Sequence, residues 1–106
     1  MNIIDSNIDS ISALCRSHNV NSLFVFGSVL TDRFNSDSDV DMLVSFKDIS
    51  AYNYADNYLN LKESLSILLG REIDLIEDAG IHNAVLRRNI DNTKKQIYGF
   101  SFKTIN

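Results

Sequence analysis

The chain has 106 residues, of which 44% are hydrophobic and 23% are charged. These proportions are ordinary for a folded globular protein and exclude a disordered chain, which would have fewer apolar residues and a larger charge imbalance. Ten basic and fourteen acidic side chains give a net charge of −4, which excludes a broad basic surface for DNA or RNA. We expect a single domain over residues 1–106, with one hydrophobic core.

Two further sequence features bear on the cellular location. No apolar run approaches the roughly 18 to 20 residues that span a bilayer, and the first residues lack the basic flank and apolar stretch of a signal peptide. The single cysteine, Cys15, cannot form an internal disulfide. It shares a helical apolar stripe with Ile8 and Ile11, so we expect a buried thiol in a cytoplasmic protein.

The first half of the chain predicts a helix, a strand, a turn and a second strand. Apolar residues at helical spacing indicate a helix from about Asp5 to His18, which Asp5 or Ser6 could cap. The short apolar run Ser22–Phe26 indicates a buried strand that ends at Gly27-Ser28. The polar stretch 29–38 indicates a helical turn and a loop, and the apolar run Val40–Phe46 indicates the next strand.

The second half predicts a helix, a strand and a closing helix. Tyrosines and leucines recur at helical spacing between about Ser50 and Leu69, and Gly70 is well placed to end that helix. Polar and apolar residues alternate in Glu72–Ile76, which is typical of a strand with one wet face. Helical spacing of apolar residues indicates a last helix over about Asn83–Tyr98. The expected fold class is α/β (α+β), a small mixed β-sheet with helices packed against it.

Acidic side chains gather at the start of the second predicted strand. Asp39 and Asp41 are two residues apart, so in an extended strand both carboxylates project to the same side, with Cα atoms about 7 Å apart. Asp41 interrupts an apolar run and costs strand propensity, so its position needs a reason. Two adjacent carboxylates repel each other, and a divalent cation such as Mg²⁺ relieves that cost.

Asp74 supplies a third carboxylate on the following predicted strand. If that strand lies beside the second one, Asp74 comes near Asp39 and Asp41. Three acidic groups could hold two cations roughly 3.5 to 4 Å apart, the separation used for in-line displacement at phosphorus. Asp74 could also accept a proton from an attacking hydroxyl. We therefore expect Asp39, Asp41 and Asp74 to be both metal ligands and catalytic residues.

Gly27-Ser28 fits the binding of a nucleotide. A glycine at the end of a buried strand lets the backbone approach a phosphate without an intervening Cβ atom. The Ser28 hydroxyl and the N–H groups that follow it can donate hydrogen bonds to phosphate oxygens.

With this motif the sequence resembles the minimal nucleotidyltransferases, small members of the DNA polymerase β-like nucleotidyltransferase superfamily. Their pattern is Gly-Ser, a spacer of about ten residues, Asp-x-Asp, and a third Asp on a later strand. Here ten residues separate Gly27-Ser28 from Asp39-Val-Asp41, and Asp74 lies in Glu-Ile-Asp-Leu-Ile. One position differs, because relatives often carry an Arg three residues after the Ser, where this chain has Thr31; Arg33 could supply the contact from a shifted position.

The resemblance implies a polymerase β-like nucleotidyltransferase fold and a transferase that moves a nucleoside monophosphate from a triphosphate to a hydroxyl. ATP is the usual donor, so AMP is the expected group, with Mg²⁺ as the cofactor and two ions in the active complex. Many small members look like antitoxins of toxin–antitoxin systems paired with a HEPN-type ribonuclease toxin, and some of them add AMP to a tyrosine of that partner. The implied acceptor is therefore a protein partner such as a HEPN toxin.

Other interpretations apply to several of these residues. A calcium loop starting at Asp37 would need Gly and Glu where the chain has Met42 and Asp48. The acids could instead form a solvated turn without function, and Asp74 could be an ordinary outward-facing residue. Zinc is not expected at His18 or His82, because neither has a ligand at the required spacing. We expect Arg71, Arg87 and Arg88 to be surface charges, although any of them could face the triphosphate. We expect Tyr54 and Tyr58 to face the core from the long helix, with a base-stacking platform as the alternative.

Two non-catalytic functions also remain open. The domain could neutralise a HEPN-type partner by occlusion alone, since larger relatives carry an additional helical domain for nucleotide and acceptor that a chain of 106 residues does not accommodate. It could also be a sensor that binds ATP and Mg²⁺ without turnover.

Overall fold

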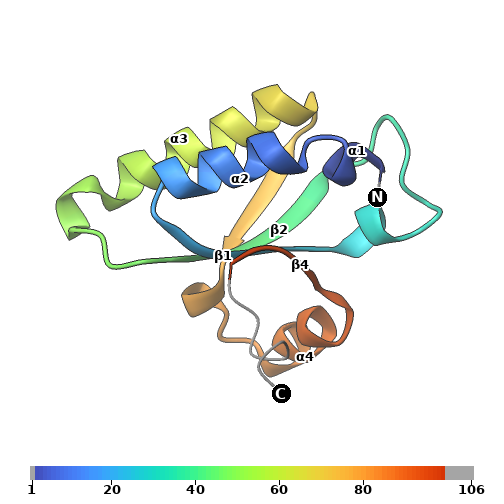
Figure 1. Cartoon of the computed structure of the whole chain (residues 1–106). Coiled ribbons are helices and arrows are strands. Elements are labelled where there is room, and N and C mark those ends of the chain that lie inside the picture. Colours follow the sequence, from blue (N-terminus) through green and yellow to red (C-terminus); the bar gives the residue numbers. More distant parts are fainter. Residues whose placement is uncertain (1, 100–106) are drawn as a thin grey trace, which may run out of the picture.

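A four-stranded mixed sheet forms the centre of the computed structural model, which describes residues 2–99 (Figure 1). The strand order is β3-β2-β1-β4. The strands β1 (Val20–Phe26) and β2 (Val40–Phe46) pair antiparallel, β2 and β3 (Ile73–Glu77) pair parallel, and β4 (Lys95–Gly99) pairs antiparallel with β1. The mixed sheet with packed helices confirms the predicted fold class.

Helices cover both faces of the sheet. Helices α2 (Ile8–Ser17) and α3 (Ala51–Leu69) lie on one face, and α4 (Ala84–Thr93) lies on the other (Figure 1). The main core is formed between the sheet and the α2–α3 layer, where α2 buries Cys15 and α3 buries Leu65. Within residues 2–99, no helix is both long enough and apolar enough to cross a bilayer.

The first predicted helix corresponds to α2, which starts a few residues later than expected and follows a separate short helix. A short helix α1 (Asn2–Asp5) precedes a turn at Ser6 and Asn7, and α2 then begins at Ile8. The capping prediction was wrong, since Asn7 occupies the N-cap position and makes no side-chain capping bond. Its side-chain Nδ2 instead donates a 2.8 Å hydrogen bond to the carbonyl of Ile3, which joins the two helices.

The central predictions are confirmed. The strand β2 has the expected bounds, and α3 ends at Gly70, whose φ of 65° is the left-handed conformation that favours glycine. The predicted helical turn is the 3-10 helix η1 (Gly27–Leu30). A second 3-10 helix, η2 (Asp78–Gly80), follows β3.

The closing helix is shorter than predicted. The helix α4 stops at Thr93, and residues 95–98, which the helical spacing had assigned to it, form the edge strand β4 together with Gly99. Lys94 turns the chain with φ −59° and ψ 147°, an extended conformation. The half-buried Ile97 is therefore a strand residue beside β1 and not the last apolar position of the helix.

Candidate active site

Asp41 and Asp74 lie side by side on adjacent strands. They are register partners in the parallel pairing of β2 with β3, so their side chains leave the same face of the sheet. Met42, the next residue along β2, is buried in the core under α2 and α3. By strand alternation the two carboxylates therefore project from the opposite face, where α4 lies. The placement of Asp74 next to Asp41, predicted on the condition that the strands were neighbours, is confirmed.

The surroundings of Asp41 disfavour its charge. Burial is the largest cause that raises the pKa of the Asp41 carboxyl, followed by the negative charges of Asp74 and Asp39 and by a side-chain hydrogen bond with Asp74. Asp39 lies one residue before β2 and is exposed, yet it is close enough to act on Asp41. The three predicted acids are thus brought together at one end of the sheet.

Gly27 lies directly against the carboxylate of Asp41. It is the residue after β1, and its φ of 77° is in the region that favours glycine. A Cβ atom at this position would overlap Oδ2 of Asp41 and would approach its Cγ to 3.3 Å. The antiparallel pairing of Phe26 with Asp41 produces this closeness. Gly27 was predicted for the approach of a phosphate, and the structure adds the approach of Asp41 as a second reason.

A cleft of about 540 Å³ opens at the turn after β1, and one of its lining residues is Gly27, the neighbour of Asp41. Its lining combines η1, the loop that follows η1 and the end of α4: Gly27, Ser28, Leu30, Thr31, Arg33 and Thr93. Both predicted nucleotide-binding residues, Gly27 and Ser28, are therefore in its wall. Sequence reasoning missed Thr93, because nothing in the sequence shows that the end of α4 returns to the turn after β1.

Thr31 and Arg33 occupy different places in this wall. The Thr31 hydroxyl donates a 2.9 Å hydrogen bond back to the carbonyl of Ser28, and it also accepts one from the backbone N–H of Arg33 at 3.2 Å. Thr31 therefore stabilises the turn. The exposed Arg33 is the cation that lines the cleft.

The acidic residues suit a hard divalent cation. Among residues 2–99, no three histidine, cysteine or acidic side chains are already arranged as a finished metal site. Asp39, Asp41 and Asp74 nevertheless fit Mg²⁺, because all three offer carboxylate oxygens. In addition, burial and the negative charges of Asp74 and Asp39 disfavour the ionised form of Asp41. A bound cation would stabilise the ionised carboxylates and so offset this cost.

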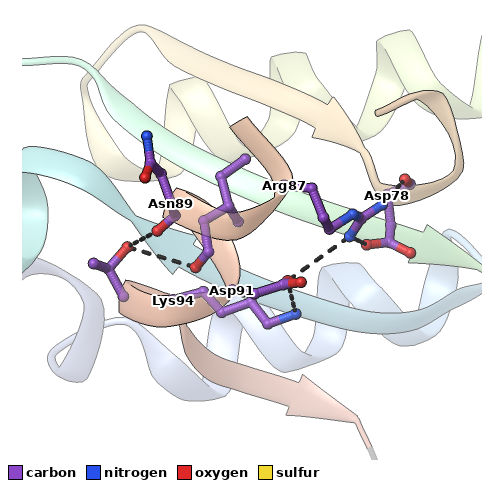
Figure 2. A network of polar contacts seen from close by, with 7 residues as sticks. Asp78, Arg87, Asn89, Asp91 and Lys94 are labelled. Carbon is purple, nitrogen blue, oxygen red and sulfur yellow. Dashed lines mark hydrogen bonds and ion pairs between the residues drawn. The ribbon is translucent and has the colours of Figure 1, made fainter. Parts of the chain in front are cut away.

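The arginines do not share one environment. Arg88 is exposed, as predicted, but Arg87 is only half-buried and pairs with two acids, with Nη1 2.6 Å from Oδ1 of Asp78 and 3.8 Å from Oδ1 of Asp91 (Figure 2). These partners raise the pKa of Arg87. Asp91 also pairs with Lys94 at 2.8 Å. This network fixes α4 against η2, and so Arg87 is already engaged within the fold.

Tyr54 and Tyr58 of α3 face the sheet, as predicted, whereas Tyr52 of the same helix is exposed. Tyr58 donates its hydroxyl to the carbonyl of Leu75, and the ring of Tyr54 stands edge-on to Phe46 with centroids 5.6 Å apart. Both side chains are half-buried. Cys15 is fully buried, as predicted, and this burial raises the pKa of its thiol to about 12.

Two curated proteins resemble the sequence over most of its length. The "Putative protein adenylyltransferase MJ1379" of Methanocaldococcus jannaschii is 35% identical over 74 residues, which are 70% of this chain and 73% of that protein. The "Protein adenylyltransferase MntA" of Thermococcus cleftensis is 32% identical over 68 residues, which are 64% of this chain and 66% of that protein.

Solved structures share the fold. One described as "Structure of putative minimal nucleotidyltransferase" has a TM-score of 0.73 at 27% identity, with 90% of this chain and 95% of that chain covered. A chain of a toxin–antitoxin crystal structure with AMP-PNP has a TM-score of 0.71 at 22% identity and covers 92% of this chain and 77% of its own length.

A third structure contains a tri-AMPylated Shewanella oneidensis HEPN toxin in complex with an MNT antitoxin. The matching chain has a TM-score of 0.65 at 20% identity, with 95% of this chain and 76% of that chain covered. At such identities the likeness to the two toxin–antitoxin structures shows the fold alone. Residues 9–102, however, match the family described as "Polymerase beta, Nucleotidyltransferase". With the mixed sheet, the paired acids and the turn at Gly27-Ser28 in place, the chain belongs to the polymerase β nucleotidyltransferase family.

Proposed function

We propose that this chain is a Mg²⁺-dependent protein adenylyltransferase that transfers AMP from ATP to a hydroxyl group of a protein partner. The observation that carries the proposal is the convergence of three carboxylates beside a glycine turn and an open cleft. The two curated relatives are named protein adenylyltransferases, and one structural neighbour was crystallised with AMP-PNP. The adenylyltransferase names of the relatives and the AMP-PNP of the neighbour both agree with ATP as the donor.

The proposal assigns a role to each residue. Asp39, Asp41 and Asp74 would hold the divalent ions, which supply charge neutralisation for the triphosphate and the leaving group. Gly27 and Ser28 would bind phosphate oxygens through the hydroxyl and the N–H groups of the turn. Arg33 would add a positive charge from the same cleft, at the position shifted from Thr31.

The proposed reaction is a substitution at the α-phosphorus of ATP. The acceptor oxygen forms a bond to the α-phosphorus of ATP, the bond from that phosphorus to the bridging oxygen breaks, and pyrophosphate leaves. Asp74 is placed beside Asp41 and would take the acceptor's proton. Catalysis of this kind depends mainly on positioning and charge stabilisation.

A HEPN-type toxin is the partner that we propose as the acceptor. The support is one structural neighbour, the complex of an AMPylated HEPN toxin with an MNT antitoxin. The setting is the cytoplasm, where ATP is available and a reducing environment keeps Cys15 a free thiol. We assign this activity to a single domain over residues 1–106.

The test is transfer of label from α-labelled ATP. With Mg²⁺ and the partner encoded beside it, the wild-type protein should label that partner, and removal of Mg²⁺ or the double change Asp39→Ala with Asp41→Ala should abolish the label. Persistence of labelling in the double variant would exclude this mechanism.

A second candidate is neutralisation of the partner by occlusion. It is favoured by Thr31, because its hydroxyl donates to the Ser28 carbonyl within the turn, at the sequence position where the minimal nucleotidyltransferases often carry an arginine. The same double variant separates the two functions. If it protects against the partner as well as the wild type does, occlusion explains the protection; if protection is lost together with labelling, transfer explains it.

A further inference from the structure

Asp39 is the one member of the acidic group that no strand holds. It is exposed and lies between β2 and a loop that begins at Thr31. A carboxylate on such a segment needs its backbone fixed if it is to face the two carboxylates of the strands. The contacts of residues 38 and 40 show how the backbone is held on each side of Asp39.

Both contacts come from the segment that leads into β3. On one side, Nη1 of Arg71 donates a 3.1 Å hydrogen bond to the carbonyl of Ser38, the group that is bonded to the nitrogen of Asp39. On the other side, the N–H of Val40 donates a 3.0 Å hydrogen bond to the carbonyl of Glu72. The segment that carries Asp74 therefore also fixes the backbone of Asp39.

The Arg71 side chain makes two further contacts with the same loop. Its Nη1 donates a 2.5 Å hydrogen bond to the carbonyl of Asn35, and its guanidinium carbon lies 4.5 Å from the centroid of the Phe34 ring. The Asn35 carbonyl also accepts the N–H of Ser38 at 3.1 Å. One guanidinium thus joins the start of β3 to the ring and two carbonyls of the loop.

The main chain of Arg71 is itself anchored. Its N–H donates to the carbonyl of Ser66 at 3.3 Å, and its carbonyl accepts the Ser66 hydroxyl at 2.7 Å. Ser66 belongs to the last turns of α3, which end at the left-handed Gly70. The guanidinium therefore extends from a fixed point in the fold toward the loop. This is more than the surface charge that the sequence predicted for Arg71.

We propose that Arg71 is a positioning residue for the metal-binding site: it fixes the peptide before Asp39 so that this carboxylate faces Asp41 and Asp74. The inference rests on the proposed function, because it assigns a divalent cation to these acids. Arg71 is a positioning residue and not a catalytic one, since the contacts of its guanidinium are with the loop that precedes β2. Residues that hold metal ligands in place typically change metal affinity about ten- to hundredfold when they are replaced.

The experiment compares Arg71→Met, Arg71→Lys and the control Arg88→Met in the full chain. Arg71→Met keeps an apolar stem beside Phe34 and removes both hydrogen bonds, whereas Arg71→Lys keeps a cation without the planar fork. Arg88 is exposed and lies on α4, an element separate from the loop and from the segment that leads into β3. Mn²⁺ affinity is measured by titration, exchange of the Ser38 and Val40 amides by NMR, and folding by the melting temperature.

We expect Arg71→Met to bind Mn²⁺ about tenfold or more weakly than the wild type, with faster exchange of both amides. The Mn²⁺ affinity of Arg71→Lys should lie between those of Arg71→Met and the wild type. The Mn²⁺ affinity and amide exchange of Arg88→Met should match the wild type. The melting temperatures should stay close, because the Asn35 carbonyl is at the surface and water can replace the guanidinium there. A loss of affinity only in proportion to lost folding would mean that Arg71 is merely structural and would overturn the proposal.

The role of Arg71 and the proposed function fail in different ways. Wild-type Mn²⁺ affinity and amide exchange in both Arg71 variants would overturn the assignment of Arg71 and leave the proposed function standing. A wild-type protein that binds no Mn²⁺ would remove the proposed function and the inference together. If Arg71→Met did not fold, Arg71→Lys would decide, since it should still show weaker Mn²⁺ binding than the Arg88→Met control.

Discussion

Gly27 satisfies two requirements at a single position. Its backbone adopts a positive φ, and the carboxylate of Asp41 occupies the space that a side chain would need. The sequence could suggest the glycine from its place after an apolar strand and from the ten residues that separate Gly27-Ser28 from Asp39. It could not reveal the contact with Asp41, because that contact depends on the antiparallel pairing of β1 with β2.

Gly27→Ala should lower both stability and cation binding. The left-handed backbone costs an L-residue about 1–2 kcal/mol, and the new Cβ must displace the Asp41 carboxylate. Gly70→Ala is the matched control, since Gly70 has φ 65° and a Cβ atom added there would meet nothing within 4 Å. Both variants should lose stability in urea titrations, but only Gly27→Ala should weaken Mn²⁺ binding. Equal Mn²⁺ affinity in the two variants would contradict this interpretation.

Asp41→Asn should make the metal-free protein more stable at neutral pH. The folded-state pKa of Asp41 is raised, first by burial and then by the charges of Asp74 and Asp39, so the ionised form costs folding free energy. This cost is present above the raised pKa and vanishes as the pH falls through it toward the unfolded-state value. We expect a higher melting temperature at pH 7, with the gain shrinking in acid.

Two measurements check this prediction. Melting curves of the metal-free wild type and Asp41→Asn should converge as the pH is lowered. Added Mg²⁺ should stabilise the wild type and leave Asp41→Asn nearly unchanged, because binding to the folded state raises stability by mass action. A variant that is less stable than the wild type at pH 7 would show that Asp41 stabilises the fold and is not a strained functional residue.

At the scale of elements, α4 and β4 differ most from what the sequence suggested. Leu86, Ile90 and Ile97 keep helical spacing across the end of the helix. Neither Gly nor Pro marks the break, which occurs at Lys94. Residues 95–99 become a strand because the edge of β1 is available for pairing, and this tertiary effect overrides the local pattern. By contrast, β2 and the end of α3 were predictable, since a compact apolar run and Gly70 define them locally.

The N-cap of α4 provides a test at this scale. The Asn83 side chain accepts hydrogen bonds from the N–H groups of Val85 at 2.9 Å and Leu86 at 3.0 Å. Asn83→Ala should therefore cost about 0.5–2 kcal/mol of stability in urea titrations. Ser50, the N-cap of α3, makes no side-chain capping bond, so Ser50→Ala serves as the control and should cost little. Equal losses in the two variants would exclude capping as the cause.

Asn83→Ala should also affect the cleft. Thr93, at the far end of α4, lines the cleft with Gly27 and Ser28. If fraying of α4 disturbs that wall, ATP should bind more weakly while Mn²⁺ affinity, which depends on the three acids, stays unchanged. Loss of Mn²⁺ affinity in Asn83→Ala would contradict the separation of the cleft wall from the acidic group.

For the whole molecule, the site is a product of strand order. Asp41 and Asp74 are far apart in the sequence. Helix α3 connects β2 to β3, and this connection allows β3 to lie parallel to β2. In a strand, residues two apart share a face, which is why Asp39 and Asp41 could be predicted to project together. Asp74 joined them on the condition that its strand lies beside theirs. Strand order is not encoded in any local pattern, so Arg71 and Thr93, which act across elements, could not be found from the sequence.

The most direct test of the cation site is Mn²⁺ binding by Asp74→Asn, measured by titration against the wild type. Asp74 is contributed by a different strand from Asp39 and Asp41, so it contributes to one site only if β2 and β3 pair in the register described. We predict that Asp74→Asn weakens Mn²⁺ binding about ten- to hundredfold while the protein stays folded. Wild-type Mn²⁺ affinity in folded Asp74→Asn would contradict the claim that the three carboxylates form one cation site.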